Sequence, residues 1–346
     1  MATKIESYVR ARETKMERKT STNREPFVSI VIPNWNGKKI LRECLHSLIS
    51  QNYRNREIIV VDNASADGSP DIIREEFPDV KLIINERNLG WAGGCNVGIK
   101  VAKGNLIALF NNDAVADPDW LSELVNAMET SSDLGIVGGI VFCDEPRDII
   151  DNTGLRLDPI SGVVWRANLG NRLAQVEDIE DIDFVSGVSL LLRRELIEKV
   201  GLLDENYFLY QDETDFGMSA KRAGFRCRIV PSAFVWHMGA RTVRKLPMEG
   251  YYLRNRSNFR FYLKNLPPKY LFTIFFFQLV VVPTREALLF KNPLFFTLKT
   301  KAFLWNLARF REILARRKEN RCLGKIRCRN RLREFLQVAK HRIYAY

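Results

Sequence analysis

The sequence lacks any pair of cysteines spaced like a metal or redox motif. Its six cysteines are scattered and none belongs to a CxxC pair. A chain of 346 residues does not need disulfides, so a reduced, cytosolic protein is expected. The N-terminal residues are charged and have no apolar segment like that of a secretory signal. Residues 1–26 are therefore expected to form a charged arm before the first domain.

An excess of charge is also missing from most of the chain. Residues 299–346 hold 15 Lys and Arg against 3 Asp and Glu, which accounts for the whole net charge of +12. Residues 1–298 are balanced. A neutral body with a basic end argues against a nucleic-acid-binding protein, which would be basic throughout.

Two common phosphate-binding motifs do not fit the glycine cluster at residues 88–98. Its spacing is not GxGxxG, and no P-loop lysine follows it. The turn at residues 33–37 has no basic residue before Lys38, whereas a nucleotidyltransferase would need a basic loop that holds phosphate near its N-terminus. A nucleotidyltransferase is therefore a weak alternative for this chain.

The chain does contain a regular alternation of apolar runs and amphipathic segments with short connections. This alternation predicts an α/β domain with a mostly parallel, Rossmann-like sheet covered by helices on both faces. Strands are expected at residues 28–32, 57–61, 81–84, 106–110 and 135–141. Helices are expected at residues 39–51, 67–77, 92–102 and 118–130.

The last of these helices is expected to have Asp117 as its N-cap and Pro118 at its first helical position. Residues 144–183 are rich in Asp and are expected to form an irregular excursion over the sheet edge. The apolar segment 184–193 should then return to the sheet and lead into a helix that ends near residue 200.

The C-terminal part differs from the rest in composition. Residues 270–282 are almost wholly apolar and aromatic, but this segment is too short to span a bilayer comfortably. Residues 294–310 mix aromatic and basic side chains, and residues 311–342 are dense in Arg. Such a region suits an interfacial helix on anionic lipid. The alternative is that these segments pack on the domain as ordinary core helices.

A polar triplet, Asn111, Asn112 and Asp113, follows the apolar run at residues 106–110. The carboxyl end of a sheet strand is where α/β proteins bind ligands. Three consecutive side chains with oxygen atoms could hold a divalent cation and a nucleotide diphosphate there. The alternative is a polar turn, since Asn and Asp favour turns.

Asp62 ends the second predicted strand at the same edge of the sheet. Its carboxylate could accept hydrogen bonds from a ribose or a pyrimidine, although an Asx turn with Ser65 explains it nearly as well. The glycine cluster at residues 88–98 precedes a predicted helix and could let the backbone approach a phosphate or sugar.

Three acids, Asp212, Glu213 and Asp215, lie in a segment flanked by aromatic residues. A carboxylate beside a substrate hydroxyl can act as a general base. His237 could complete a cation site. The alternatives are an acidic helix start favoured by the helix dipole and a polar histidine in the core.

Together, the motifs resemble family 2 glycosyltransferases with the GT-A fold. Especially similar are the rhamnosyl- and galactofuranosyl-transferase-like members, which build bacterial and archaeal surface polysaccharides. The resemblance covers about residues 26–265 and rests on five strings, "VSIVIPNWNG", "VVDNASADGS", "NLGWAGGCNVGI", "LFNNDA" and "FLYQDETDF". It implies a transferase domain at residues 27–265 and an amphipathic, basic C-terminal extension at residues 266–346.

The resemblance also implies roles for individual residues. Asp62 would contact the base of the nucleotide, and the other substrate-binding residues would be Pro33, Asn36, Asn88, Gly90, Asn96, Asn111 and Asn112. The triplet ending at Asp113 stands where the family has its DXD-type metal motif, so Asp113 would be the main ligand of Mg2+ or Mn2+.

His237 matches a histidine that some members use as a further metal ligand. Glu213 occupies the position of the catalytic base, and Asp212 is the fallback because the usual Glu-Asp order is swapped.

The implied function is inverting transfer of a sugar from a nucleotide-diphosphate sugar to a glycan or lipid-linked acceptor, in cell-surface polysaccharide or glycoconjugate synthesis. The implied setting is the cytoplasm, peripheral to the inner face of the cell membrane, with a homo-oligomer possible and no nucleic acid as partner. A non-catalytic membrane-associated scaffold is the alternative from another class.

Overall fold

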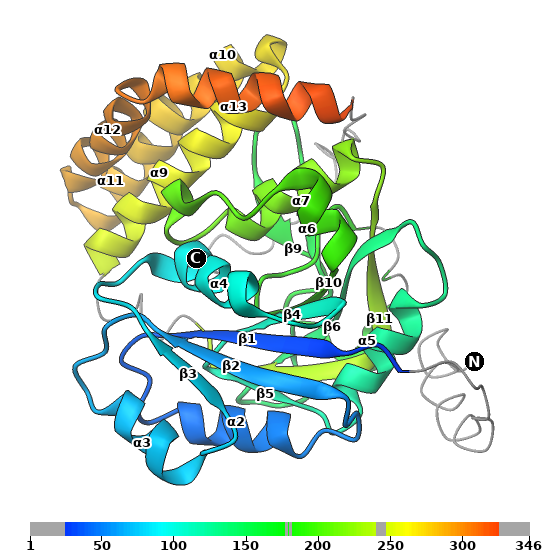
Figure 1. Ribbon diagram of the computed structural model, residues 1–346. Helices are drawn as coiled ribbons and strands as arrows, with labels where there is room; N and C mark the ends of the chain where they lie inside the picture. Colours follow the sequence, from blue (N-terminus) through cyan, green and yellow to red (C-terminus); the bar gives the residue numbers. More distant parts are fainter. Residues whose placement is uncertain (1–24, 177–178, 180–181, 240–246, 325–346) are drawn as a thin grey trace.

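The computed structural model describes residues 25–176, 179, 182–239 and 247–324. Residues 1–24 of the predicted arm and residues 325–346 of the basic C-terminal extension lie outside the described residues. The described chain folds around a nine-stranded mixed sheet, with a separate two-stranded hairpin beside it (Figure 1).

The first four strands are those expected from the apolar runs. They are β1 (Val28–Asn34), β2 (Arg56–Asp62), β3 (Lys81–Ile84) and β4 (Leu106–Phe110). They pair in parallel in the order β3-β2-β1-β4, and Asn34 lies opposite Asp62. The carboxyl ends of these strands therefore meet at one edge, where α/β sheets bind ligands.

The other half of the sheet is mixed. Strand β10 (Ser189–Arg193) runs antiparallel between β4 and β6 (Leu134–Cys143), and β11 (Arg226–His237) runs parallel to β6. Two short strands, β5 (Ala114–Ala116) and β7 (Ile150–Asn152), pair antiparallel with β11 and β6. The predicted α/β sheet flanked by helices is confirmed, with β10 as an antiparallel member.

The segment at residues 144–183 needs a correction, because it is not wholly irregular. Besides β7, it holds the antiparallel hairpin of β8 (Leu155–Leu157) and β9 (Val164–Arg166) and the short helix η1 (Leu173–Gln175). Three-residue strands are too short to show a hydrophobic period, so the sequence pattern did not reveal them.

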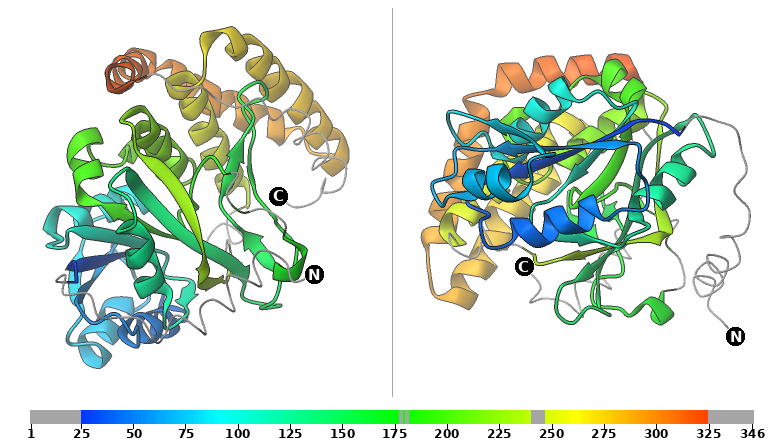
Figure 2. Two further views of the ribbon diagram at one scale, coloured as in Figure 1. Left: turned by 90° about the vertical axis from the view of Figure 1, so that its right-hand side faces the viewer. Right: turned by 60° about the horizontal axis from the view of Figure 1, so that its bottom comes forward.

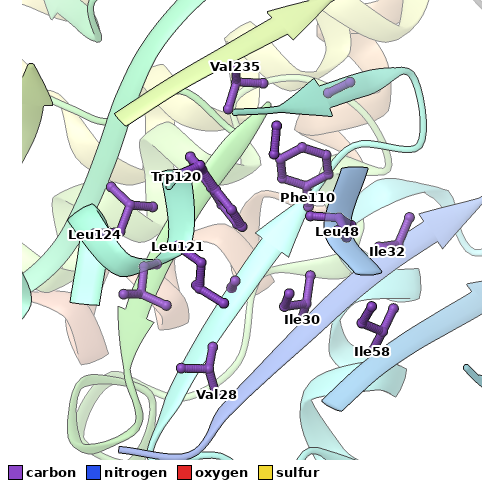
Figure 3. Packing of buried hydrophobic residues seen from close by; sticks show 14 of the residues in the cluster. Val28, Ile30, Ile32, Leu48, Ile58, Phe110, Trp120, Leu121, Leu124 and Val235 are labelled. Carbon is purple, nitrogen blue, oxygen red and sulfur yellow. The ribbon is translucent and has the colours of Figure 1, made fainter. Parts of the chain in front are cut away.

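Helices cover both faces of the sheet. One face carries α2 (Leu41–Ile49), α3 (Ser69–Glu76) and α5 (Trp120–Met128), and the other carries α4 (Gly90–Val101), α6 (Arg194–Val200) and α7 (Asp212–Arg222). Alternate residues of β1 enter different cores: Ile30 and Ile32 face α2, whereas Val31 packs with the α4 side. Figure 3 shows the first core, in which Phe110 and Trp120 meet edge to face.

The start of α5 differs from the prediction. The helix begins at Trp120, and its N-cap residue is Asp119, not Asp117. The Asp117 carboxylate instead accepts a hydrogen bond from the Asp119 backbone N–H at 3.0 Å, and its carbonyl accepts one from Trp120 N–H at 2.9 Å. Asp117 and Pro118 therefore form a turn before the helix.

A C-terminal layer of helices lies on the opposite side of the molecule from α2 and α3 (Figure 1) and stays together in the two further views (Figure 2). We call α9–α13 the helical layer. It consists of α9 (Pro247–Asn265), α10 (Pro268–Phe276), the π-helical turn η3 (Phe277–Val281), α11 (Val282–Phe290), α12 (Leu294–Leu307) and α13 (Phe310–Leu323). Helix α9 packs against α7, α12 and α13 and so joins the sheet domain to the rest of this layer, and the domain boundary at residue 266 stays a prediction.

The apolar helix of this layer is longer than the predicted segment 270–282. Helices α10, η3 and α11 are continuous, and Pro268–Leu289 is long and apolar enough, by length and composition, to cross a membrane. The π-helical turn comes just before Pro283, which lacks a backbone N–H and disturbs regular α-helical bonding.

Candidate active site

Buried polar side chains connect the loops that follow β1 and β2. Asn34 Nδ2 donates to Asp62 Oδ1 at 2.8 Å, and Ser65 N donates to Asp62 Oδ2 at 2.8 Å. The exposed Asn36 joins the same network, because its N–H donates to Ser65 Oγ at 2.8 Å and its Oδ1 accepts from Ala66 N at 2.9 Å. Asp62 is fully buried and holds this loop in place. Its contact with a nucleotide base stays a prediction.

The two asparagines of the triplet are held by the protein. Asn111 Oδ1 accepts a hydrogen bond from Trp91 Nε1 at 2.8 Å, and Asn112 Nδ2 donates to Asn34 Oδ1 at 2.7 Å. A Cβ on Gly37 would lie 2.2 Å from Asn34 Oδ1, so this contact requires glycine there. Asp113 is consequently the one carboxylate that the triplet offers. The sequence pattern did not single out Asn34, whose partner Asn112 is 78 residues away.

Asp113 lies directly beside His237. The distance from His237 Nε2 to Asp113 Oδ1 is 3.2 Å, and Met238 N donates to the Asp113 carbonyl at 3.0 Å. The pairing of β5 with β11 brings the two residues together, because Ala114 lies opposite His237. Burial lowers the pKa of His237, but the hydrogen bond and charge of Asp113 outweigh burial and raise that pKa above its ordinary value.

These two side chains suit a divalent cation that is completed by a substrate. Among the described residues, no group of three or more His, Cys, Asp or Glu side chains could hold a metal by itself. One carboxylate and one imidazole leave several coordination positions for phosphate oxygens and water, as Mg2+ sites in nucleotide enzymes commonly do. His237 Nδ1 is buried and has no hydrogen-bond partner in the described structure. The donor set therefore fits a cation shared with a diphosphate.

At the start of α4, the backbone passes close to the segment that leads into α7. Asn88 Oδ1 accepts a hydrogen bond from Gly90 N at 2.8 Å, and Gly90 has φ +74°. A Cβ on Gly90 would lie 2.3 Å from the Phe208 carbonyl oxygen, which accepts from Trp91 N at 2.8 Å. Glycine is therefore required where α4 meets the segment that leads into α7.

Two more predicted residues lie on or beside α4. Pro33 packs against its second turn, because a Cβ on Gly94 would lie 3.0 Å from Pro33 Cβ. Asn96 is buried, and its amide is used within the protein: Nδ2 donates to Leu203 O and Glu205 Oε1, both at 2.9 Å, and Oδ1 accepts from Leu203 N. These bonds give Asn96 a structural role between α4 and η2 (Glu205–Tyr207).

Glu213 lies close to the asparagine triplet. A Cβ on Gly187 would be in ordinary contact, at 3.5 Å, with the Glu213 side chain. The next residue, Val188, accepts the backbone hydrogen bond of Asn111 at 2.9 Å. The predicted base and the predicted metal motif, 100 residues apart along the chain, are thus separated by the short segment before β10.

Among residues 25–176, 179, 182–239 and 247–324, no basic side chain forms an ion pair with the first two acids of α7. Asp212 Oδ1 accepts from Glu213 N at 3.1 Å, whereas Asp212 Oδ2 is buried without a hydrogen-bond donor. Burial raises the pKa of Asp212, and burial together with the neighbouring Asp212 raises the pKa of Glu213 well above its ordinary value. Glu213 is half-buried and Asp212 is fully buried, so Glu213 is better placed to meet a substrate.

The segment that leads into α7 has a strained backbone. Phe208, Tyr210 and Gln211 have φ of 62°, 68° and 64°, which non-glycine residues rarely adopt. Helix α9 holds this segment: the Ser257 hydroxyl lies 3.0 and 2.8 Å from two of its carbonyl oxygens, and Gln211 Nε2 donates to Asn258 Oδ1 at 2.9 Å. The helical layer thus supports the turn that presents the two acids.

The third acid, Asp215, makes a full set of contacts on the other side of α7. It is buried and accepts hydrogen bonds from Tyr207 Oη at 3.0 Å, Asn265 Nδ2 at 2.6 Å and Lys264 Nζ at 2.7 Å. Its role is to join α7 to α9.

The sequence profile of glycosyl transferase family 2 matches residues 29–201, which is half of the chain. The chain belongs to this family. The resemblance stated from the motifs is confirmed at that level, and the family 2 match covers β1–β4, the triplet and β10, but neither α7 nor the helical layer.

Relatives of this family 2 chain include an uncharacterized glycosyltransferase of Nostoc, 30% identical over 51% of this chain and 54% of the relative. Another is the glycosyltransferase AglE of Haloferax volcanii, 25% identical over 59% and 64% of the two chains. An N-acetylglucosaminyl-diphospho-decaprenol L-rhamnosyltransferase of Mycobacterium tuberculosis is 25% identical over 64% and 79%. The match spans about half to two thirds of the first two relatives.

Two solved structures share the fold of this family 2 chain. GalNAc-T7 with UDP, GalNAc and Mn2+ has a TM-score of 0.58 at 16% identity and covers 85% of this chain and 58% of its own. The mannosyltransferase PcManGT of Pyrobaculum calidifontis, in complex with GDP-Man and Mn2+, has a TM-score of 0.52 at 17% identity and covers 98% and 89%. Both are glycosyltransferases by name, in agreement with the predicted GT-A-like fold.

Proposed function

We propose that the protein is an inverting glycosyltransferase that moves a sugar from a nucleotide-diphosphate sugar to a hydroxyl group. The observation that carries this proposal is the position of Glu213 against the Gly187–Val188 segment, which also anchors Asn111. The carboxyl group of Glu213 and the carboxylate–imidazole pair of Asp113 and His237 thereby lie at one edge of the sheet. Transfer of an activated sugar to a hydroxyl group needs a base for the hydroxyl proton and a cation for the departing diphosphate.

Asp113 and His237 would hold Mg2+ or Mn2+ together with the donor diphosphate. The cation would offset negative charge on the departing diphosphate. Two fold neighbours were solved with Mn2+ and a nucleotide sugar or its components, which supports a divalent cation in this chain. Asn36, Asn88 and the backbone at Gly90 would contact the nucleotide and sugar of the donor.

Glu213 would accept the proton of the acceptor hydroxyl. The acceptor oxygen forms a bond to the anomeric carbon while the bond from that carbon to the diphosphate oxygen breaks, and the bonding electrons leave with the diphosphate. A single displacement of this kind inverts the anomeric configuration. Asp212 is the alternative base, but its buried position favours a role in raising the pKa of Glu213.

The donor sugar, the acceptor and the location of the protein form the finer part of the proposal. The rhamnosyltransferase of Mycobacterium tuberculosis favours a rhamnosyl- or galactofuranosyl-type donor and a lipid-linked acceptor in envelope polysaccharide synthesis. The basic C-terminal extension favours a peripheral position at the inner face of the cell membrane. The predicted homo-oligomer stays a prediction.

Turnover of nucleotide sugars by the purified chain tests the proposal. With a panel of donors and Mn2+, we expect release of nucleoside diphosphate, and we expect Asp113→Ala and Glu213→Gln to lower it by at least about 100-fold. Asp71→Ala, an exposed acid of α3, is the matched control and should match the wild type. No turnover of any donor would favour the non-catalytic scaffold, whereas full activity of both site variants would overturn the assignment of Asp113 and Glu213.

A further inference from the structure

Exposed large apolar side chains are concentrated in the helical layer. Of the 17 such side chains among the described residues, 13 lie between residues 272 and 314. Phe272 is 83% exposed and Leu288 is 74% exposed, and only 17% of the most apolar window of Pro268–Leu289 is buried. A patch of this kind on a folded protein marks an interaction site.

The helix formed by α10, η3 and α11 has its apolar and polar sides partly reversed. Gln278 faces the protein and is 8% exposed, whereas Phe272 and Phe276 face outward at 83% and 51%. A surface helix of a water-soluble domain normally turns its polar side chains outward. The outer side of this helix therefore suits an apolar medium.

Helix α12 shows the same reversal. Lys299 and Asn306 are buried, at 2% and 0% exposure, and Asn306 Nδ2 donates to the Arg256 carbonyl at 2.9 Å. Phe296, Leu304 and Leu307 face outward. Two helices that are distinct along the chain thus present apolar side chains to the surroundings and keep polar ones against the protein.

The charge around these side chains identifies the partner. Residues 266–311 contain seven Lys and Arg and one acid, Glu286, whose carboxylate accepts a hydrogen bond from the Tyr251 hydroxyl. Lys269, Arg285 and Lys291 are exposed beside the apolar patch. A basic rim around apolar side chains matches an anionic lipid surface, and it would repel a second copy of the same face.

We propose that the outward faces of α10, η3, α11 and α12 form a surface that seats the protein on an anionic lipid bilayer. Phe272, Phe276 and Leu288 enter the lipid, and the basic side chains meet the headgroups. Because the inner side of this helix packs on α9 and α12, the helix lies along the bilayer instead of crossing it. This surface is a property of the helical layer and does not depend on the proposed catalytic activity.

Vesicle flotation with the full chain tests this surface. We expect the wild type to float with vesicles of phosphatidylcholine and phosphatidylglycerol, to float less at high salt, and to bind phosphatidylcholine alone more weakly. The triple variant Phe272→Ser, Phe276→Ser, Leu288→Ser should bind at least about tenfold more weakly, or about 1.4 kcal/mol. The matched control is Ile84→Ser with Leu202→Ser, two exposed apolar residues of the sheet domain, which should bind as the wild type does.

The three substituted side chains are exposed, so the triple variant should keep the circular dichroism spectrum of the wild type. Failure of the wild type to float with either vesicle would overturn the proposal, as would equal flotation of the triple variant. So would a wild-type dimer that the triple variant breaks without a change in vesicle binding, because the patch would then be an interface between two copies. Each readout is independent of sugar turnover.

Discussion

Three carboxylates lie within one turn at the start of α7, and they differ in the partners that the described residues give them. Asp215 receives donors from Tyr207, Lys264 and Asn265, whereas one oxygen of Asp212 has no donor among the described residues and the other accepts from the Glu213 backbone N–H. The same helix start thus carries one acid with a basic partner and two acids that form no ion pair within the part of the chain that the structure describes. A buried acid without a basic partner costs stability, so Asp212 and its neighbour Glu213 are candidates for a functional role.

The basic partners of Asp215, and of the nearby Asp204, come from α9. Lys264 Nζ lies 2.7 Å from Asp215 Oδ2 and 2.9 Å from Asp204 Oδ2, and Arg260 also contacts Asp204 at 2.8 Å. Burial alone would raise the pKa of Asp204, but the charges of Lys264 and Arg260 hold that pKa far below its ordinary value. The helical layer therefore supplies positive charge to Asp204 and Asp215, and its described residues form no ion pair with Asp212 or Glu213.

The largest expected effect is the loss of stability when Asp215, the acid with a basic partner, is replaced. Asp215→Ala should lower the free energy of unfolding by about 3 kcal/mol, because it leaves buried donors without an acceptor. The loss stays at the lower end for a broken buried pair, since Lys264 keeps its contact with Asp204. Urea denaturation measures the change. Asp71→Ala, which removes an exposed ion pair with Arg74, should cost less than about 1 kcal/mol. Equal losses in the two variants would contradict the comparison.

The apolar runs that end at Asp62 and Phe110 were readable from the sequence because a buried parallel strand is a local pattern. The difference between Asp215 and the other two acids could not be predicted from the sequence, because it depends on partners far along the chain. Lys264 is 49 residues from Asp215, and the Leu203 that uses the Asn96 amide is 107 residues away. The site residues were found by motif, and their structural neighbours by the fold alone.

Replacing Glu213 should change the free energy of unfolding in the opposite direction. Because burial raises the pKa of Glu213, the folded protein holds a proton that the unfolded chain releases above the ordinary pKa of about 4.3. Wild-type stability then falls as pH rises from that value to the raised pKa. Glu213→Gln does not titrate, so it should be more stable than the wild type, by up to about 1.4 kcal/mol for each pH unit crossed in that window.

Chemical denaturation of both proteins at several pH values between acid and neutral measures this difference. The difference should be absent below the ordinary pKa, where Glu213 is protonated in both states. Turnover should follow the same group, because a base must be ionised, and the acid limb of the rate profile should lie above that of an ordinary carboxylic acid. A Glu213→Gln variant that is less stable at neutral pH would place Glu213 with Asp215 among the acids that have a basic partner.

The smallest expected effect concerns how α9 holds the turn before Asp212 and Glu213. The Ser257 hydroxyl is buried between two carbonyl oxygens of a segment with strained backbone, so Ser257→Ala should cost about 1 kcal/mol. If these hydroxyl contacts fix the position of Glu213, kcat should fall about fivefold while the Kd of the nucleotide is unchanged. Ser122→Ala, which removes a hydroxyl bond within α5, is the control that should leave kcat as it is. A change in nucleotide Kd without a change in kcat would mean that α9 supports the donor side of the site and not the acids.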